Sequence, residues 1–156
     1  MKYHHHVGRQ DQYVAALDQV LELTVLLHDD MTGSLARDGL TISRARLLWE
    51  LRQLGPTTQT ALADALEVSA RNVTGLVDGL VASGFVTREP HPTDRRAFLV
   101  SFTEHGAAVV KVMEQGQQQL AHLLFAGMAP QRFDCFVQGL GMVLDRLRDR
   151  LLAEDS

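Results

Sequence analysis

The arginines in the middle of the chain are the side chains best suited to bind a charged or planar partner. The 156-residue sequence has a net charge of −4, which argues against a nonspecific coat for nucleic acid. The charge is uneven, because residues 41–100 carry seven bases against six acids and the remaining residues carry eight bases against thirteen acids. All seven central bases are arginine, at positions 44, 46, 52, 71, 88, 95 and 96. A planar guanidinium offers paired donors to phosphates and base edges, so binding chemistry is expected here.

Other kinds of chemistry find no support in the residue types. No nucleophile–base pair, glycine-rich phosphate loop or pair of carboxylates occurs, so no enzyme activity is expected. The histidines at 4–6 are set aside as native or tag sequence, and no two of the other four are three or four residues apart, so neither a metal nor a cofactor is expected. Cys135, the single cysteine, excludes an internal disulfide and is expected to be a buried thiol. His28 is expected in the core or an interface, and Trp49 in the core or an effector pocket.

These arginines lie on a predicted series of helices interrupted by one hairpin. Hydrophobic periodicity and capping residues predict six helices, over residues 11–37, 42–54, 58–66, 70–82, 104–127 and 131–153. Thr57 or Thr58 would begin the third helix and Ser69 the fourth. Residues 85–88 are instead of β-like composition and residues 97–102 alternate with a period of two, on either side of a proline-containing loop, which predicts a β-hairpin. The fold class is therefore mainly α (α+β), with six helices and a two-stranded hairpin.

The third and fourth predicted helices have the spacing of a helix-turn-helix. Their facing sides need apolar residues, which are Leu62, Leu66, Val68, Val73 and Leu76. Ala63 is small where the helices touch. Glu67 stands in the turn, where glycine is usual because φ is positive, and a non-glycine residue there costs roughly 1 kcal/mol. A helix pair with no role in DNA binding would show the same apolar pattern, but a hairpin directly after the second helix is typical of a wing.

Both ends of the chain carry more apolar surface than the central 60 residues can cover. We therefore expect a homodimer, with residues 1–40 as an N-terminal dimerisation helix and 103–156 as C-terminal dimerisation helices. Residues 41–102 would form the DNA-binding domain. The alternative is a monomer in which the long helices complete a single core.

The sequence resembles the MarR family of winged helix-turn-helix transcriptional regulators. The matching segments are the helix pair, Gly84-Phe85-Val86-Thr87-Arg88, Pro92-Thr93-Asp94-Arg95-Arg96-Ala97 and Ser101-Phe102-Thr103-Glu104-His105-Gly106. They include the family's Asp-x-Arg element of the wing and, with phenylalanine in place of leucine, its Leu-Thr-x-x-Gly element. The order of helices matches along about 140 residues.

The resemblance implies that the fourth helix enters the major groove of double-stranded DNA and the wing lies over the minor groove. Ser69 would then contact phosphate, Arg71 guanine or phosphate, Asn72 adenine, and Thr74 a thymine methyl or a phosphate. The wing would place Arg95 and Arg96 at a narrow minor groove, with Asp94 orienting Arg96 by an ion pair. The helix carries Gly75 and Gly79 where family members often have arginine. Arg71 and Asn72 could instead be merely solvated on an exposed helix face, and Arg95 and Arg96 could contact phosphate alone, which gives affinity without sequence choice.

The expected function is that of a MarR-like regulator, a repressor, which binds a pseudo-palindromic operator as a homodimer. A small aromatic or phenolic effector is expected to change the separation of the two recognition helices. The alternatives are a winged-helix module for protein–protein interaction and an effector-independent DNA-binding protein. No apolar run approaches the ~20 residues of a membrane span and no export segment is evident, so we expect a cytoplasmic protein without membrane contact.

Overall fold

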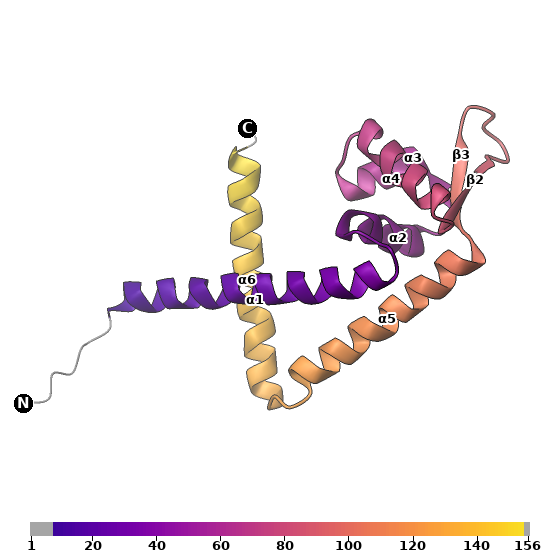
Figure 1. The fold of residues 1–156 in the computed structure, drawn as a ribbon. Helices are drawn as coiled ribbons and strands as arrows, with labels where there is room; N and C mark the ends of the chain where they lie inside the picture. Colours follow the sequence, from indigo (N-terminus) through magenta and orange to yellow (C-terminus); the bar gives the residue numbers. More distant parts are fainter. Residues whose placement is uncertain (1–7, 155–156) are drawn as a thin grey trace, which may run out of the picture. The chain divides into compact units, whose positions relative to one another are not determined.

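The computed structural model describes residues 8–154, so the histidine run at 4–6 lies outside the described residues. Its elements, shown in Figure 1, are α1 (Arg9–Arg37), α2 (Ile42–Leu54), β1 (Thr57–Thr58), α3 (Gln59–Leu66), α4 (Ala70–Ala82), β2 (Val86–Pro90), β3 (Phe98–Phe102), α5 (Glu104–Phe125) and α6 (Pro130–Glu154). Every predicted helix and both hairpin strands are present, with ends within two residues of the prediction. The mainly helical fold class is confirmed.

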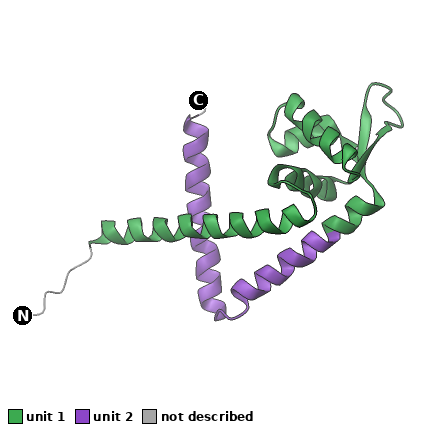
Figure 2. Cartoon of the chain, viewed as in Figure 1, with its two compact units in different colours: residues 1–110 green, residues 111–156 purple. Residues whose placement is uncertain are grey.

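The chain forms two compact units, residues 1–110 and 111–156, coloured green and purple in Figure 2. The boundary between them falls inside α5. The predicted three-part division at residues 40 and 102 concerns roles in dimerisation and binding, and it stays a prediction.

The core of the first unit fixes which side of α4 faces outward. Ten side chains are almost completely inaccessible to solvent: Leu47, Leu48, Leu51, Leu62, Leu80, Val73, Val77, Val86, Val100 and Val110. On α4 the buried positions are 73, 77 and 80, which recur at helical spacing along one face. Each such burial contributes roughly 1.5–3 kcal/mol, so α4 has little freedom to rotate. Its opposite side, at positions 71, 75, 78 and 82, is exposed, and we call it the outer ridge of α4.

Hydroxyl side chains begin three helices of this unit. The side chains of Thr41, Thr58 and Ser69 each accept a hydrogen bond from the backbone N–H three residues later, at 3.3, 3.2 and 3.1 Å. Such a cap contributes about 1 kcal/mol and fixes where the helix starts. Of the two residues predicted as the N-cap of α3, Thr57 and Thr58, the structure therefore shows Thr58.

The sheet has one strand more than the predicted hairpin. Strands β2 and β3 pair antiparallel, from Val86 opposite Phe102 to Pro90 opposite Phe98. The two-residue strand β1 pairs with the other edge of β3, with Thr57 opposite Val100, which gives the order β1-β3-β2. Two residues are too few to show an alternation, so only the partner strand makes β1 a strand. This pairing ties the start of α3 to the base of the wing.

A single residue, Thr103, joins the wing to α5. Its hydroxyl lies 2.6 Å from the carbonyl oxygen of Gly84 and 3.2 Å from that of Phe85, and it accepts the N–H of Gly106 at 3.0 Å. A Cβ at Gly106 would lie 1.9 Å from the Phe85 carbonyl oxygen. Glycine is therefore required at position 106, because the backbone of α5 approaches the backbone before β2 too closely for any side chain.

Several expectations about individual side chains are corrected. Cys135 is exposed in the chain and does not form the expected buried thiol. The phenylalanine cluster beside it does exist, since the ring of Phe125 lies 5.7 Å from that of Phe133 and 5.9 Å from that of Phe136, but the thiol does not join it. His28 is exposed on α1, so it is no core residue, whereas an interface role stays open. Trp49 is half-buried.

The described helices include none that is long and apolar enough to cross a membrane. Among the described residues, no cluster of three or more His, Cys, Asp or Glu side chains could hold a metal ion.

Candidate nucleic-acid interface

Helices α3 and α4 meet at the sharp turn expected from the sequence. Glu67 adopts the left-handed conformation, with φ 56° and ψ 42°, so the chain takes the glycine-like geometry without a glycine. The N–H of Val68 donates to the carbonyl oxygen of Ala63 at 3.1 Å, and that of Glu67 donates to Asp64 at 3.2 Å. The buried side chains of Leu62, Leu66 and Val73 hold the two helices together, and this offsets the strain of the turn.

The four candidate residues at the start of α4 are exposed. They are its N-cap Ser69 and, in its first two turns, Arg71, Asn72 and Thr74. The Ser69 oxygen already accepts the capping hydrogen bond, which leaves its O–H free to donate to an anion at the helix N-terminus. Within residues 8–154, the side chains of Arg71 and Asn72 have no hydrogen-bond partner, so both are available to a ligand.

A solvent-open hollow runs along the α2 side of these residues. Its volume is about 410 Å³, and its lining is formed by Ser43, Arg46, Leu66, Val68, Arg71, Asn72, Gly75 and Leu76. The residues from α2 and α4 that line it include two arginines and no acid.

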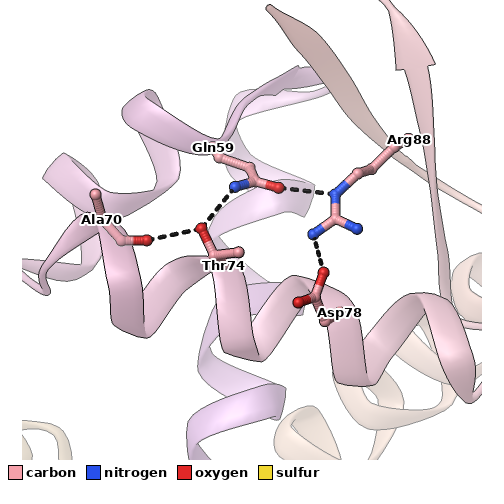
Figure 3. Close-up of polar contacts among 5 residues, drawn as sticks. All are labelled: Gln59, Ala70, Thr74, Asp78 and Arg88. Atoms are coloured by element: carbon pink, nitrogen blue, oxygen red, sulfur yellow. Dashed lines mark hydrogen bonds and ion pairs between the residues drawn. The ribbon is translucent and has the colours of Figure 1, made fainter.

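The other side of α4 is tied to α3 and the wing by a polar network (Figure 3). The Thr74 hydroxyl donates to the Ala70 carbonyl oxygen at 2.8 Å and accepts from Gln59 Nε2 at 3.1 Å. Gln59 Oε1 accepts from Arg88 Nε at 2.8 Å, and Arg88 Nη2 forms an ion pair with Asp78 Oδ1. The hydroxyl expected to reach a phosphate is thus already engaged within the protein, and the Thr74 methyl group is what remains for contact.

Sequence reasoning missed Gln59, Asp78 and Arg88 as parts of this surface. Their contacts join residues 10 to 29 positions apart, on α3, α4 and β2. Such contacts cannot be predicted from the spacing of residues along the sequence. The only available signal was that Arg88 belongs to the arginine-rich segment.

The wing loop, residues 91–97, is ordered by the side chains of His91 and Asp94, which accept hydrogen bonds from its backbone. His91 Nδ1 accepts the N–H groups of Thr93 and Asp94 at 3.2 and 3.0 Å. Asp94 Oδ1 accepts the backbone N–H of Arg96 at 3.0 Å, in place of the ion pair expected with its guanidinium. Asp94 therefore shapes the loop, and the side chains of Arg95 and Arg96 are exposed, with no ion pair in the described part of the chain.

Comparison with known proteins agrees with this geometry. A sequence model of the MarR family matches residues 40–98, which run from the end of the α1–α2 turn into the wing. The HTH-type transcriptional regulator YpoP of Bacillus subtilis is 31% identical over 110 residues, covering 70% of this chain and 69% of that protein. The chain belongs to the MarR family.

Other transcriptional regulators match this chain over at least half of its length. The HTH-type transcriptional repressor YetL of Bacillus subtilis is 28% identical over 158 residues, covering 94% of this chain and 93% of YetL. The crystal structure of a MarR variant from E. coli complexed with operator DNA has a TM-score of 0.64 at 25% identity, covering 85% of this chain and 96% of that chain. The match to a regulator of Mycobacterium leprae, 36% identical, spans about half of that relative, 56% of its length.

Proposed function

We propose that this MarR-family chain is a transcriptional repressor that binds a pseudo-palindromic operator as a homodimer. The observation that carries the proposal is the pairing of two exposed cationic features on one unit, the outer side of α4 with Arg71 and Asn72 and the wing loop with Arg95 and Arg96. The naming of YetL as a repressor and the E. coli MarR–operator complex support it.

The chemistry assigns different tasks to helix and wing. Inserted in the major groove, α4 would direct Arg71 to guanine or phosphate and Asn72 to the paired donor and acceptor of adenine. Ser69 would donate to a phosphate, and Thr74 would offer its methyl group to thymine. The wing arginines would lie in the minor groove, where a narrow groove attracts positive charge but distinguishes bases poorly. Asp94 keeps its wing-orienting role in this proposal, through the loop backbone.

The proposal of a homodimer rests on apolar surface that the chain does not cover itself. On α1, Val14 is 53% exposed and Leu21 55%, and Leu35 is the only buried residue. On α6 no residue is buried, and Leu147 and Leu151 are 52% and 53% exposed. Surfaces of this kind on a water-exposed helix indicate a partner, and a second copy of the chain gives an operator with two half-sites.

We further propose that a small aromatic or phenolic effector controls binding. Two recognition helices must be spaced by about 34 Å to enter successive major grooves, so a ligand that changes this spacing by a few ångströms weakens binding. We assign no catalytic role, metal or cofactor to the chain. A regulator of this kind works where the DNA is, so we place it in the cytoplasm.

The test separates helix from wing by fluorescence anisotropy on operator and scrambled duplexes at several salt concentrations. Asn72→Ala should cost about 1–3 kcal/mol on the operator alone and relax the preference at one base pair per half-site. Arg96→Ala should weaken binding to every sequence and lower the salt slope by roughly one ion per wing. Arg132→Ala, on α6, is the control for loss of a positive charge. Intact operator binding in both variants would favour the protein-interaction module instead.

The effector is tested separately. Operator affinity is measured during titration with phenolic and other aromatic acids, and a fall in affinity is expected with at least one of them. Unchanged affinity throughout the series would favour the effector-independent DNA-binding protein.

A further inference from the structure

Gly79 of α4 is in close contact with an arginine from another helix. A Cβ built at Gly79 would lie 2.5 Å from Nη2, 2.8 Å from Cζ and 3.0 Å from Nε of Arg44. Three atoms of one guanidinium group therefore rest against the backbone of α4, at the place where any other residue would carry a side chain. Arg44 belongs to the first turn of α2, so this contact reaches from one helix to the other.

Folding alone gives no reason for this arrangement. A glycine inside a helix costs about 1 kcal/mol relative to alanine, and position 79 is well inside α4. The guanidinium of Arg44 is half-buried and forms no ion pair or hydrogen bond within the described residues. Its donors are thus unused by the chain, and the group lies against the backbone of α4 at Gly79.

The position of Gly79 directs these free donors toward the proposed DNA surface. Gly79 lies next to Asp78 and four residues after Gly75, so it flanks the outer ridge of α4 on the side where Ser43 and Arg46 line the hollow. The ridge itself has no basic residue after Arg71. An arginine lying across Gly79 puts a positive charge beside the second half of the helix, whose one charged residue is the acid Asp78.

We propose that Arg44 binds a phosphate of the DNA backbone from α2, reaching across Gly79 and supplying the cation that the second half of α4 lacks. This inference rests on the proposed function. The guanidinium offers five donors in a planar arrangement that fits phosphate oxygens, and a phosphate contact fixes the position of the helix without reading a base. Gly79 is the positioning residue, because only the absence of a Cβ leaves room for the guanidinium.

The experiment is a double-mutant cycle on the full-length protein, with a mixed-sequence duplex as the probe, because a phosphate contact does not need the operator. Anisotropy gives Kd as a function of salt for the wild type, Arg44→Ala, Gly79→Ala and the double variant. Arg44→Ala should raise Kd about tenfold and reduce the salt slope by about 0.9 per protomer. Gly79→Ala keeps the charge but displaces it, so Kd should rise similarly while the melting temperature stays equal or rises.

In the double variant the second substitution should add nothing. Arg37→Ala, in the last turn of α1, is the control for loss of one positive charge, and circular dichroism verifies folding. A wild type that binds no duplex overturns the proposed function and this inference together. If the wild type binds and Arg44→Ala matches it in Kd and salt slope, the inference alone is overturned. It is also overturned if Gly79→Ala weakens binding equally in the Arg44→Ala background, because the new methyl group then obstructs the DNA itself.

Discussion

Glu67 turns the chain between α3 and α4 in a conformation that suits glycine, with φ 56°. The residue is exposed, and its backbone N–H closes the end of α3. Removing the Cβ by Glu67→Gly should therefore raise the free energy of unfolding, by up to about 1 kcal/mol. Urea denaturation measures the change, and Glu67→Ala, which keeps the Cβ, is the matched control. Equal stabilities for the glycine and alanine variants would show that the turn is not strained.

Asp78 is an acid on the outer ridge of α4, where the proposed partner is a polyanion. Its ion pair with Arg88 is partly exposed, with 59% of the Asp78 side chain and 27% of the Arg88 side chain accessible, so the pair contributes about 1 kcal/mol to stability. The charge matters more for binding, because a carboxylate facing phosphates is repelled and Arg88 compensates only in part.

Asp78→Asn should accordingly increase affinity for mixed-sequence DNA a few-fold, with little change in stability. Anisotropy at low and high salt measures the gain, which should shrink as salt screens the charge. Asp134→Asn on α6 removes an equal charge elsewhere and serves as control. A loss of affinity would mean that Asp78 itself contacts a base.

At the scale of elements, the connection between the sheet and α5 depends on Gly106. A Cβ at this position would lie 1.9 Å from the Phe85 carbonyl oxygen, which two hydrogen bonds hold in place. Neither this carbonyl group nor the backbone of α5 can therefore move easily to relieve the clash. Gly106→Ala should lower the free energy of unfolding by about 3 kcal/mol.

Gly116 supplies the matched control for that substitution. It lies in the same helix, and a Cβ there would meet no atom within 4 Å. Gly116→Ala should leave stability unchanged or raise it by up to about 1 kcal/mol. Thermal and urea denaturation of both variants provide the comparison, and equal effects of the two substitutions would contradict the close approach at Gly106.

The elements that could be predicted from the sequence are those with local signals. The start of α4 follows from Ser69, and the wing follows from the change of period after Ala82, because each signal lies within a few residues of the structure that it produces. Strand β1 could not be predicted, since its two residues become a strand only through pairing with β3, more than 40 positions later.

The candidate site likewise has residues that could be predicted from the sequence and contacts that could not. Arg71, Asn72 and the wing arginines could be identified from their neighbours in the sequence, and they are exposed as expected. The contact of Arg44 with Gly79 and the chain of hydrogen bonds from Thr74 to Asp78 could not, because each depends on how two helices and a strand pack. Of the two glycines that set α4 apart in the sequence, Gly79 makes room for Arg44 of α2, whereas a Cβ at Gly75 would meet no atom within 4 Å.

At the scale of the whole molecule, the proposed homodimer depends on the apolar face of α6. Leu147 is 52% exposed in the single chain, and replacing it by aspartate would place a charge in the buried interface. Leu147→Asp should shift sedimentation at micromolar concentration from about twice 17.3 kDa towards the mass of one chain. Gln138→Glu adds a charge on the opposite side of α6 and should leave the dimer intact. A wild type that sediments as a folded monomer would contradict the two-half-site operator.

The single-residue junction at Thr103 has a mechanical consequence. Because its hydroxyl and its N–H are both bound to the backbone just before β2, the first turn of α5 cannot rotate without carrying the sheet with it. One residue inserted there would rotate the helix by about 100° relative to the wing. The joint therefore couples the two elements: a rotation of the first turn of α5 is passed to the strands through the hydrogen bonds of Thr103.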